Sequence, residues 1–322
     1  MLHPTYKLQI ASDTLEPSTS DDVVSIYVNL SMDIPADIFE AILRMSDKSL
    51  KFKQDDDISI SLGYNQQIIG VFKGKVDTVK PEVSKLRVTG LNSIWKLINQ
   101  RMNRLYEKQS AGKIVSDLAK ASGVATGEIM DGISFPSYAV DDNKSSYEHI
   151  RELAKRCGFD VYVTSDNKLT FKKYSRENVH TFEYRKNIIS VDGYYYKSEF
   201  GSVKVFGESP SSTKGSDTWH WLTKKEVEGM AGSGPALLIT DPVLRDKDTA
   251  EKVAKAKLNI LNRNLLLTIE TVGKSEVKLG DTLEIKSMPD SNLNGDFQVR
   301  NVEHIFNKSE GFKTIIGCRS VK

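Results

Sequence analysis

The sequence DDISISLGYNQQIIGVF at residues 56–72 has a counterpart in DTLEIKSMPDSNLNGDF at residues 281–297. Both stretches begin with aspartate and continue with the apolar–polar alternation that is typical of a half-buried strand. The apolar positions coincide at an offset of 225 residues up to the phenylalanine, and at 226 where Val76 matches Val302. One added residue or a β-bulge explains that change of offset. The repeat therefore predicts two similar β modules with different material between them.

Residues 1–95 have the composition of strands separated by short turns. Gly, Asn and Asp occur between the alternating segments, which favours a β-barrel or a sandwich. The expected strands lie at residues 6–10, 24–30, 58–62, 68–79 and 86–88.

Residues 96–175 change character. Apolar positions at helical spacing predict a helix at 110–122 that ends at Gly123. A second helix begins at Ser145, where Glu148 stands at the spacing of a capping box. A hairpin over residues 159–171 follows, so this part is expected to be a compact α+β unit.

Residues 176–322 return to strands, with one helix near 248–262. Asp248 and Glu251 have capping-box spacing at the start of that helix. Two stretches, 209–217 and 229–235, are polar or glycine-rich and are expected to be loops. The predicted fold is thus mainly β within the α+β class: a β domain at 1–95, an α+β domain at 96–175 and a second β domain at 176–322.

Composition excludes several classes of protein. The 322 residues include 45 Lys and Arg against 43 Asp and Glu, a formal charge of +2, so no global field indicates stable binding to nucleic acid or an acidic membrane. No apolar run approaches the roughly 18 residues of a membrane span, and the first residues lack a secretory signal. Cys157 and Cys318 are expected to be reduced core residues, which indicates synthesis in the cytoplasm.

The sequence contains no recognisable motif for catalysis, for a cofactor or for a metal. The histidines at 3, 149, 180, 220 and 304 have no ligand spacing, and His149 is expected to face solvent on its helix. The glycine-rich stretch 229–235 lacks the Gly-Lys-Ser/Thr of a phosphate-binding loop. No Gly-x-Ser-x-Gly elbow is present. We therefore predict no catalytic, cofactor-binding or metal-binding residue.

Acidic clusters at 21–22, 55–57 and 141–142 are candidates for the paired carboxylates of a glycosidase. Each falls at an expected strand boundary or turn, where aspartate is favoured for local hydrogen bonding. A cell-wall hydrolase that uses Asp55 to Asp57 or Glu148 as its acid remains an alternative.

Aromatic residues at 194–196 and at Trp219 and Trp221 could stack on sugars or bases. Alternation would place both tryptophans on one strand face, which suits a protein interface equally well. A carbohydrate- or nucleic-acid-binding module is therefore a further alternative.

The order of these parts resembles the late control protein D family, the tail hubs of contractile phages, whose fold also forms the base of type VI secretion spike proteins. The likeness spans most of residues 58–318 and is carried by the order of several stretches. These are Phe72–Asp77 with Leu86–Leu91 and Leu97, Ser110–Leu118, Tyr147–Ala154 with Gly158 and Phe159, and Leu279–Ile285 with Leu293–Val299 and Val302–His304.

The resemblance implies two similar β-barrels around an inserted α+β domain, and a homotrimeric ring of six barrels around a channel for DNA or cargo. Such a ring presents a quasi-sixfold face to a tail tube and a threefold face to a trimeric spike, through heterologous subunit contacts. It implies a non-enzymatic baseplate hub that assembles into a virion tail or an injection particle. Because the sequence stops at Lys322 without a β-helical extension, the spike is expected to be a separate chain, and other baseplate proteins are expected partners.

Overall fold

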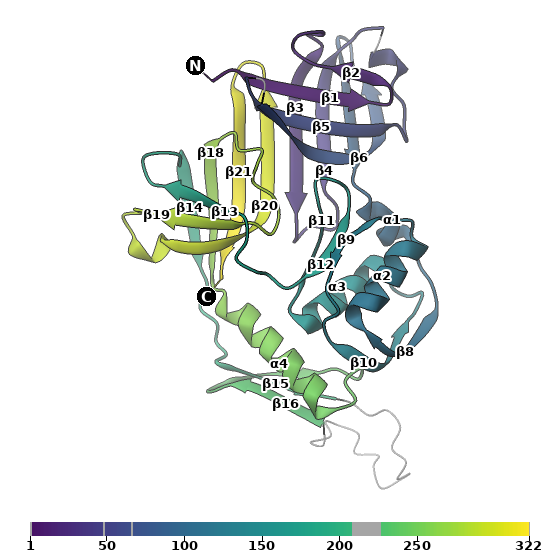
Figure 1. The fold of residues 1–322 in the computed structure, drawn as a ribbon, viewed down its shortest axis with the longest axis vertical. Helices are drawn as coiled ribbons and strands as arrows, with labels where there is room; N and C mark the ends of the chain where they lie inside the picture. Colours follow the sequence, from purple (N-terminus) through teal and green to yellow (C-terminus); the bar gives the residue numbers. More distant parts are fainter. Residues whose placement is uncertain (1, 48, 66, 208–226, 322) are drawn as a thin grey trace.

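The chain has a mainly β fold, seen in a computed structural model that describes residues 2–47, 49–65, 67–207 and 227–321. Strands dominate both ends of the chain, and helices occur in the middle and in one late segment (Figure 1). The predicted fold class is confirmed. Two short 3-10 helices, η1 (Ser49–Lys51) and η4 (Ser291–Leu293), lie between strands.

The first β unit is an antiparallel set of strands in the spatial order β3-β4-β7-β6-β5-β1-β2. Its strands alternate inward apolar and outward polar residues, as in β5, where Ile58, Ile60 and Leu62 are buried. The strands are β1 (Pro4–Ile10), β2 (Asp13–Leu15), β3 (Val23–Ser31), β4 (Ile38–Arg44), β5 (Asp57–Tyr64), β6 (Gln67–Pro81) and β7 (Lys85–Leu91).

The second β unit has the spatial order β14-β18-β21-β20-β19-β13. Its pairs are antiparallel except for β13 and β19, which run parallel. The strands are β13 (Val179–Glu183), β14 (Ser190–Tyr195), β18 (Leu265–Val272), β19 (Thr282–Lys286), β20 (Gly295–Asn307) and β21 (Gly311–Ser320).

The repeated sequence forms three consecutive antiparallel strands in each unit, β5-β6-β7 in the first and β19-β20-β21 in the second. The phenylalanines that end the two quoted stretches, Phe72 and Phe297, are both buried. Against β21, β20 shifts register between Val299 and Asn301. This lies in the interval in which the repeat requires one added residue. Strand β6 of the first copy also shifts register, against β5 at Ile60 and Ser61 and against β7 between Val76 and Thr78.

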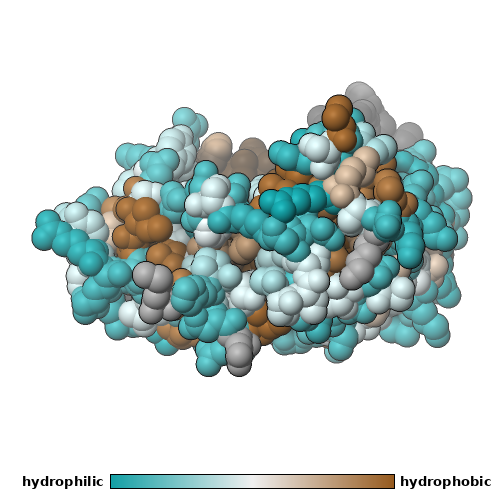
Figure 2. Space-filling view, turned by 90° about the horizontal axis from the view of Figure 1, so that it is seen from above, coloured by the Kyte–Doolittle hydropathy of each residue, from teal (hydrophilic) through white to brown (hydrophobic). Residues whose placement is uncertain are grey.

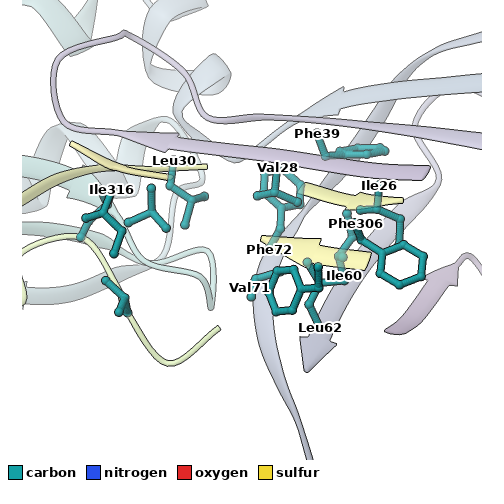
Figure 3. Packing of buried hydrophobic residues seen from close by; sticks show 14 of the residues in the cluster. Ile26, Val28, Leu30, Phe39, Ile60, Leu62, Val71, Phe72, Phe306 and Ile316 are labelled. Carbon is teal, nitrogen blue, oxygen red and sulfur yellow. The ribbon is translucent and has the colours of Figure 1, made fainter. Parts of the chain in front are cut away.

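The two β units share one sheet. Residues 25–31 of β3 pair antiparallel with residues 301–307 of β20, while the first residues of β20 pair with β19. The described pairings therefore form a single 13-stranded sheet, in which β19 and β13 branch off at β20, rather than two closed cylinders. In Figure 3, Val28 of β3 lies near Phe72, and Leu30 farther along the same strand lies beside Ile316 of β21. One strand thus contributes to the apolar core of both units.

The middle of the chain is an α+β unit, as expected. Helix α3 begins at a capping box formed by Ser145 and Glu148 and ends at Gly158, which has a left-handed φ of 66°. The predicted hairpin is β11-β12, to which β9 adds in parallel. The elements are α1 (Ile94–Asn99), β8 (Arg104–Ser110), α2 (Ala111–Ala121), β9 (Thr126–Ile129), β10 (Ser134–Val140), α3 (Ser146–Cys157), β11 (Asp160–Val163) and β12 (Leu169–Lys172).

A layer of β15 (Ser202–Phe206), β16 (Glu228–Gly232), β17 (Ala236–Thr240) and α4 (Lys247–Asn262) packs on this middle unit (Figure 1). Its buried side chains belong to the same apolar cluster as those of α2 and α3. The second β unit instead shares its core with the first. Part of the 176–322 segment is therefore packed with the middle of the chain, because the apolar face of α4 is buried on that side. The residues concerned include Val203, Val205, Leu244, Ala250, Val253 and Ala254.

Two local predictions in this layer are wrong. The N-cap of α4 is Asp246, which accepts a hydrogen bond from the backbone N–H of Thr249 at 2.8 Å, so Asp248 falls in the first turn and pairs with Lys252. The glycine-rich stretch 229–235 is not a loop throughout, since residues 228–232 form β16. A Cβ atom at Gly229 would lie 2.1 Å from the Ala250 backbone, so glycine lets this strand touch α4.

A buried carboxyl group connects the first β unit to the middle unit. Asp37 is 2% exposed, and its side chain accepts hydrogen bonds from the Ser31 backbone N–H at 2.8 Å and from Asn92 Nδ2 at 2.5 Å. Burial raises the pKa of Asp37 to about 7, although both hydrogen bonds act in the opposite direction. The folded protein therefore holds a proton at Asp37 that the unfolded chain releases near pH 4.

Asp37 makes stability depend on pH. Between about pH 4 and pH 7 the folded state binds more protons at this site, so its contribution to the free energy of unfolding is full at low pH and is lost as the pH rises through about 7. Asp37→Asn should flatten this slope, while lowering stability at acidic pH because one acceptor is lost. Urea unfolding at several pH values from about 4.5 to 7.5 measures this pH dependence of the free energy of unfolding. Asp192→Asn, on the exposed face of β14, is the control; an unchanged slope in Asp37→Asn would contradict the assignment.

Candidate functional site

Arg300, at the β20 bulge, joins three parts of the chain. Its guanidinium donates to both carboxylate oxygens of Asp33, at 2.7 and 3.1 Å, and to Asp160 at 2.9 Å. Asp33 follows β3, and Asp160 begins β11. Burial alone would lower the pKa of Arg300, but the two carboxylates raise it on balance. The residue added in the second copy of the repeat therefore ties both β units to the middle unit.

A series of hydrogen bonds runs from Asp160 to the end of α4. Gln298 donates to Asp160 at 2.6 Å and accepts from Arg263, the C-cap residue of α4, at 2.9 Å. The Arg263 guanidinium lies 5.5 Å from the centre of the Tyr174 ring. Such stacking holds the charged group in a defined place.

Arg319 is held in the same manner. Its Nε donates to the Arg263 carbonyl oxygen at 2.8 Å, and its guanidinium lies 5.5 Å from the centre of the Tyr196 ring. Burial lowers the pKa of both Arg263 and Arg319. Two arginines are thus fixed side by side, partly removed from water.

A cleft of about 490 Å³ opens beside these arginines, between the second β unit, the middle unit and α4. We call it the basic cleft, because eight of its lining residues are Lys or Arg and only Asp33 and Asp160 are acidic. Both carboxylates pair with Arg300, and Lys252 pairs with Asp248. In the described part of the chain, the other six cations have no carboxylate within 4.0 Å. They are Arg151, Lys155, Lys173, Lys255, Arg263 and Arg319.

Sequence reasoning missed the basic cleft, because a net charge of +2 conceals a local excess. One signal was present. Lys252, Lys255, Asn259 and Arg263 follow one another at helical spacings of three, four and four, which places them on one face of α4. The strand residues that complete the cleft come from distant parts of the chain.

The acidic clusters lie in turns and at strand starts, and the structure does not bring them together. Asp21 pairs with Arg44 and Lys308. Asp56 accepts a hydrogen bond from the Lys53 backbone at 2.9 Å, and Asp57 pairs with Lys75. These carboxylates therefore have local structural partners.

Glu148 occupies the capping box of α3. Its carboxylate accepts from the Ser145 backbone N–H at 2.7 Å and from the Ser145 hydroxyl at 2.8 Å. These hydrogen bonds lower the pKa of Glu148. A general acid needs a raised pKa near neutrality, so this environment does not suit the hydrolase alternative.

The described histidines at 3, 149, 180 and 304 do not form a cluster, and His220 lies outside the described residues. The prediction that His149 faces solvent is wrong: it is 2% exposed, and its Nε2 lies 3.0 Å from the Asp141 carbonyl oxygen, because the end of β10 covers that side of α3. His304 is buried in β20, which lowers its pKa to about 3. His180 Nε2 lies 2.9 Å from Asp281.

Within residues 2–47, 49–65, 67–207 and 227–321, no group of three or more His, Cys, Asp or Glu side chains is placed to hold a metal ion. Cys157 and Cys318 are both free thiols, and burial raises the pKa of Cys157 to about 11. None of the described helices combines the length and the apolar character needed to cross a membrane.

The aromatic residues considered as binding residues for sugars or bases differ in their exposure. Tyr194 and Tyr195 are exposed on β14, whereas Tyr196 lies under Arg319. Trp219, Trp221 and the expected loop at 209–217 lie outside the described residues.

Solved structures with the same fold come from phage tails and a related machine. A 43 kDa tail protein of prophage MuSo2 from Shewanella oneidensis is 12% identical, with a TM-score of 0.73 and coverage of 98% of both chains. A tail protein from Neisseria meningitidis is also 12% identical, with a TM-score of 0.73 over 99% of this chain and 97% of that one.

A third similar structure is an E. coli component of the type VI secretion system, itself structurally similar to bacteriophage T4 tail proteins. It is 10% identical, with a TM-score of 0.59 over 97% of this chain and 76% of its own. No family model matches the sequence, and none of the curated proteins matches it significantly. The tail-hub-like fold expected from the sequence is therefore confirmed as a fold.

Removing the Arg300 cation should destabilise the protein strongly. Arg300→Met leaves Asp160 mostly buried without its cation, which costs about 3–5 kcal/mol for a buried pair. Asp33→Asn should cost less than about 1 kcal/mol, because the Asp33 side chain is 64% exposed. Urea unfolding compares the two variants, and equal losses would argue against this account.

Glu148→Ala tests the hydrolase alternative. We expect it to lower stability slightly through loss of the capping box, and to leave the release of peptidoglycan fragments the same as with the unchanged protein. Ser145→Ala breaks the same cap but keeps the carboxylate, so it is the matched control. Release that disappears in Glu148→Ala and persists in Ser145→Ala would establish Glu148 as an acid.

Proposed function

We propose that this protein is the structural baseplate hub of a contractile tail or injection system. Three copies would form a ring that adapts a sixfold tail tube to a threefold central spike, with a channel for DNA or cargo. The role is mechanical, and it uses no catalytic residue, cofactor or metal.

The observation that carries this proposal is the repeat: two copies of the same three-strand pattern are joined in one sheet through β3 and β20. Three chains would present six similar β units in a ring, so a threefold assembly could meet a sixfold one. The fold shared with phage tail proteins over nearly the whole chain supports the same assignment.

The expected partners follow from this geometry. A tail tube protein would contact the quasi-sixfold face, and a separate trimeric spike and other baseplate proteins would bind elsewhere on the ring. Synthesis in the host cytoplasm would precede assembly into the particle.

Strand β14 offers a surface for the contact between copies. It stands at one end of the sheet path, and its only described strand partner is β18. Tyr194 is 65% exposed and Tyr195 48%, and Leu266, the β18 residue paired with Tyr194, is 39% exposed. Exposed aromatics on an unpaired sheet edge are suited to a subunit interface. On the face shown in Figure 2, brown groups are separated by hydrophilic residues.

The ring can be tested by sedimentation and by electron cryo-microscopy of the full chain, alone and with its tube protein. We expect particles of three times the 36.0 kDa chain mass, with threefold symmetry and a central hole. Particles that stay monomeric under both conditions, or that lack threefold symmetry, would refute the proposal.

A charge on β14 should weaken that ring. Tyr195→Lys places a cation at the proposed contact, so we expect a shift from trimer toward monomer at the same protein concentration. Leu238→Lys, at an exposed apolar position on β17, is the control and should leave the trimer intact. Equal effects of both variants would place the contact elsewhere.

A further inference from the structure

The basic cleft keeps a positive charge that the described chain does not neutralise. Lys155 of α3 and Lys255 of α4 are exposed at its rim, and neither has a carboxylate partner there. The pKa of the neighbouring Lys257 is lowered, first by burial and then by the charge of Lys155. The cations gathered in this cleft create a positive electrostatic potential, which would attract an anionic ligand.

Two of the four arginines that line the cleft, Arg263 and Arg319, are held in place before any ligand binds. Arg263 and Arg319 lie against tyrosine rings and make backbone or amide hydrogen bonds, so little side-chain freedom remains to be lost on binding. Each uses one nitrogen in its described hydrogen bonds. The other guanidinium N–H groups could therefore donate to a carboxylate.

Apart from Asn259, the uncharged lining consists of apolar side chains, Cys157 and two glycines. Ile133, Phe159 and Ile260 line the cleft together with Met32 and Ala256. Mixed lining of this kind favours a ligand that carries both carboxylates and apolar side chains.

Nucleic acid fits these features less well. Single-strand binding relies on aromatic rings that are open for base stacking. The rings of Tyr174 and Tyr196 already have a guanidinium over them. A peptide uses the cations and the apolar lining together.

A second copy of this chain is also a poor ligand. In its acidic clusters, Asp21 pairs with Lys308 and Asp57 with Lys75, so these carboxylates would have to give up an ion pair in order to enter the cleft. An acidic segment of a different protein would not have to break these ion pairs in order to bind.

We propose that the basic cleft binds an acidic, partly apolar peptide segment of another protein. The site goes beyond the proposed hub role, because its charges and its geometry belong to a single chain and do not require a ring.

Fluorescence anisotropy of the full chain with a short fluorescein-labelled peptide of leucine, aspartate and glutamate tests this site. We expect saturable binding that weakens as salt is raised. The double variant Lys155→Glu with Lys255→Glu should weaken binding by about tenfold or more. Asn259→Lys, which adds a cation to the same face of α4, should tighten it.

The matched control is Lys80→Glu with Lys120→Glu, which changes the net charge equally at exposed positions on β6 and α2, away from the cleft lining. It should bind the peptide as the unchanged protein does. The proposal is overturned if both double variants lose binding equally, if a labelled oligothymidine binds more tightly than the peptide, or if no saturable binding occurs. Trimer formation is measured separately, so failure of the ring would be distinguished from failure of this site.

Discussion

The pairing of β3 with β20 is the constraint on which the rest of this structure depends. It joins residues 25–31 to residues 301–307, so the two ends of the chain form one sheet and one apolar core. Neither unit needs to close on itself, because each finds its missing neighbour in the other. Pairing two segments this far apart closes a long loop and so costs conformational entropy. Burial of the shared apolar core must offset that cost.

Arg300 turns that pairing into a three-way junction. The bulge interrupts the alternation of β20 between Val299 and Asn301, and the guanidinium reaches carboxylates of the first β unit and of the middle unit. The break in the sequence repeat and the joint between the parts are therefore the same residue. A bulge is suited to this role because it bends a strand and redirects a side chain without ending the strand.

The junction also shapes the basic cleft. Asp160 is held by Arg300 and Gln298, and Gln298 in turn holds Arg263 at the end of α4. The acidic groups of the cleft are thus used to join the parts, while six of its eight lysines and arginines have no carboxylate within 4.0 Å in the described chain. A framework joined in this way, with a cationic recess, is compatible with the proposed hub role.

Local signals in the sequence determined much of this fold. The repeat and its bulge depend on strand alternation, and the limits of α3 depend on Ser145, Glu148 and Gly158, whose effects reach only a few residues along the chain. Only the tertiary structure decided which residues that are distant in the sequence come into contact. Asp33 is 267 residues from Arg300, and Asp160 is 140 residues from it. The burial of His149 and the packing of α4 on the middle unit likewise depend on which segments meet. No local pattern reports such contacts, so the basic cleft became visible only in the folded chain.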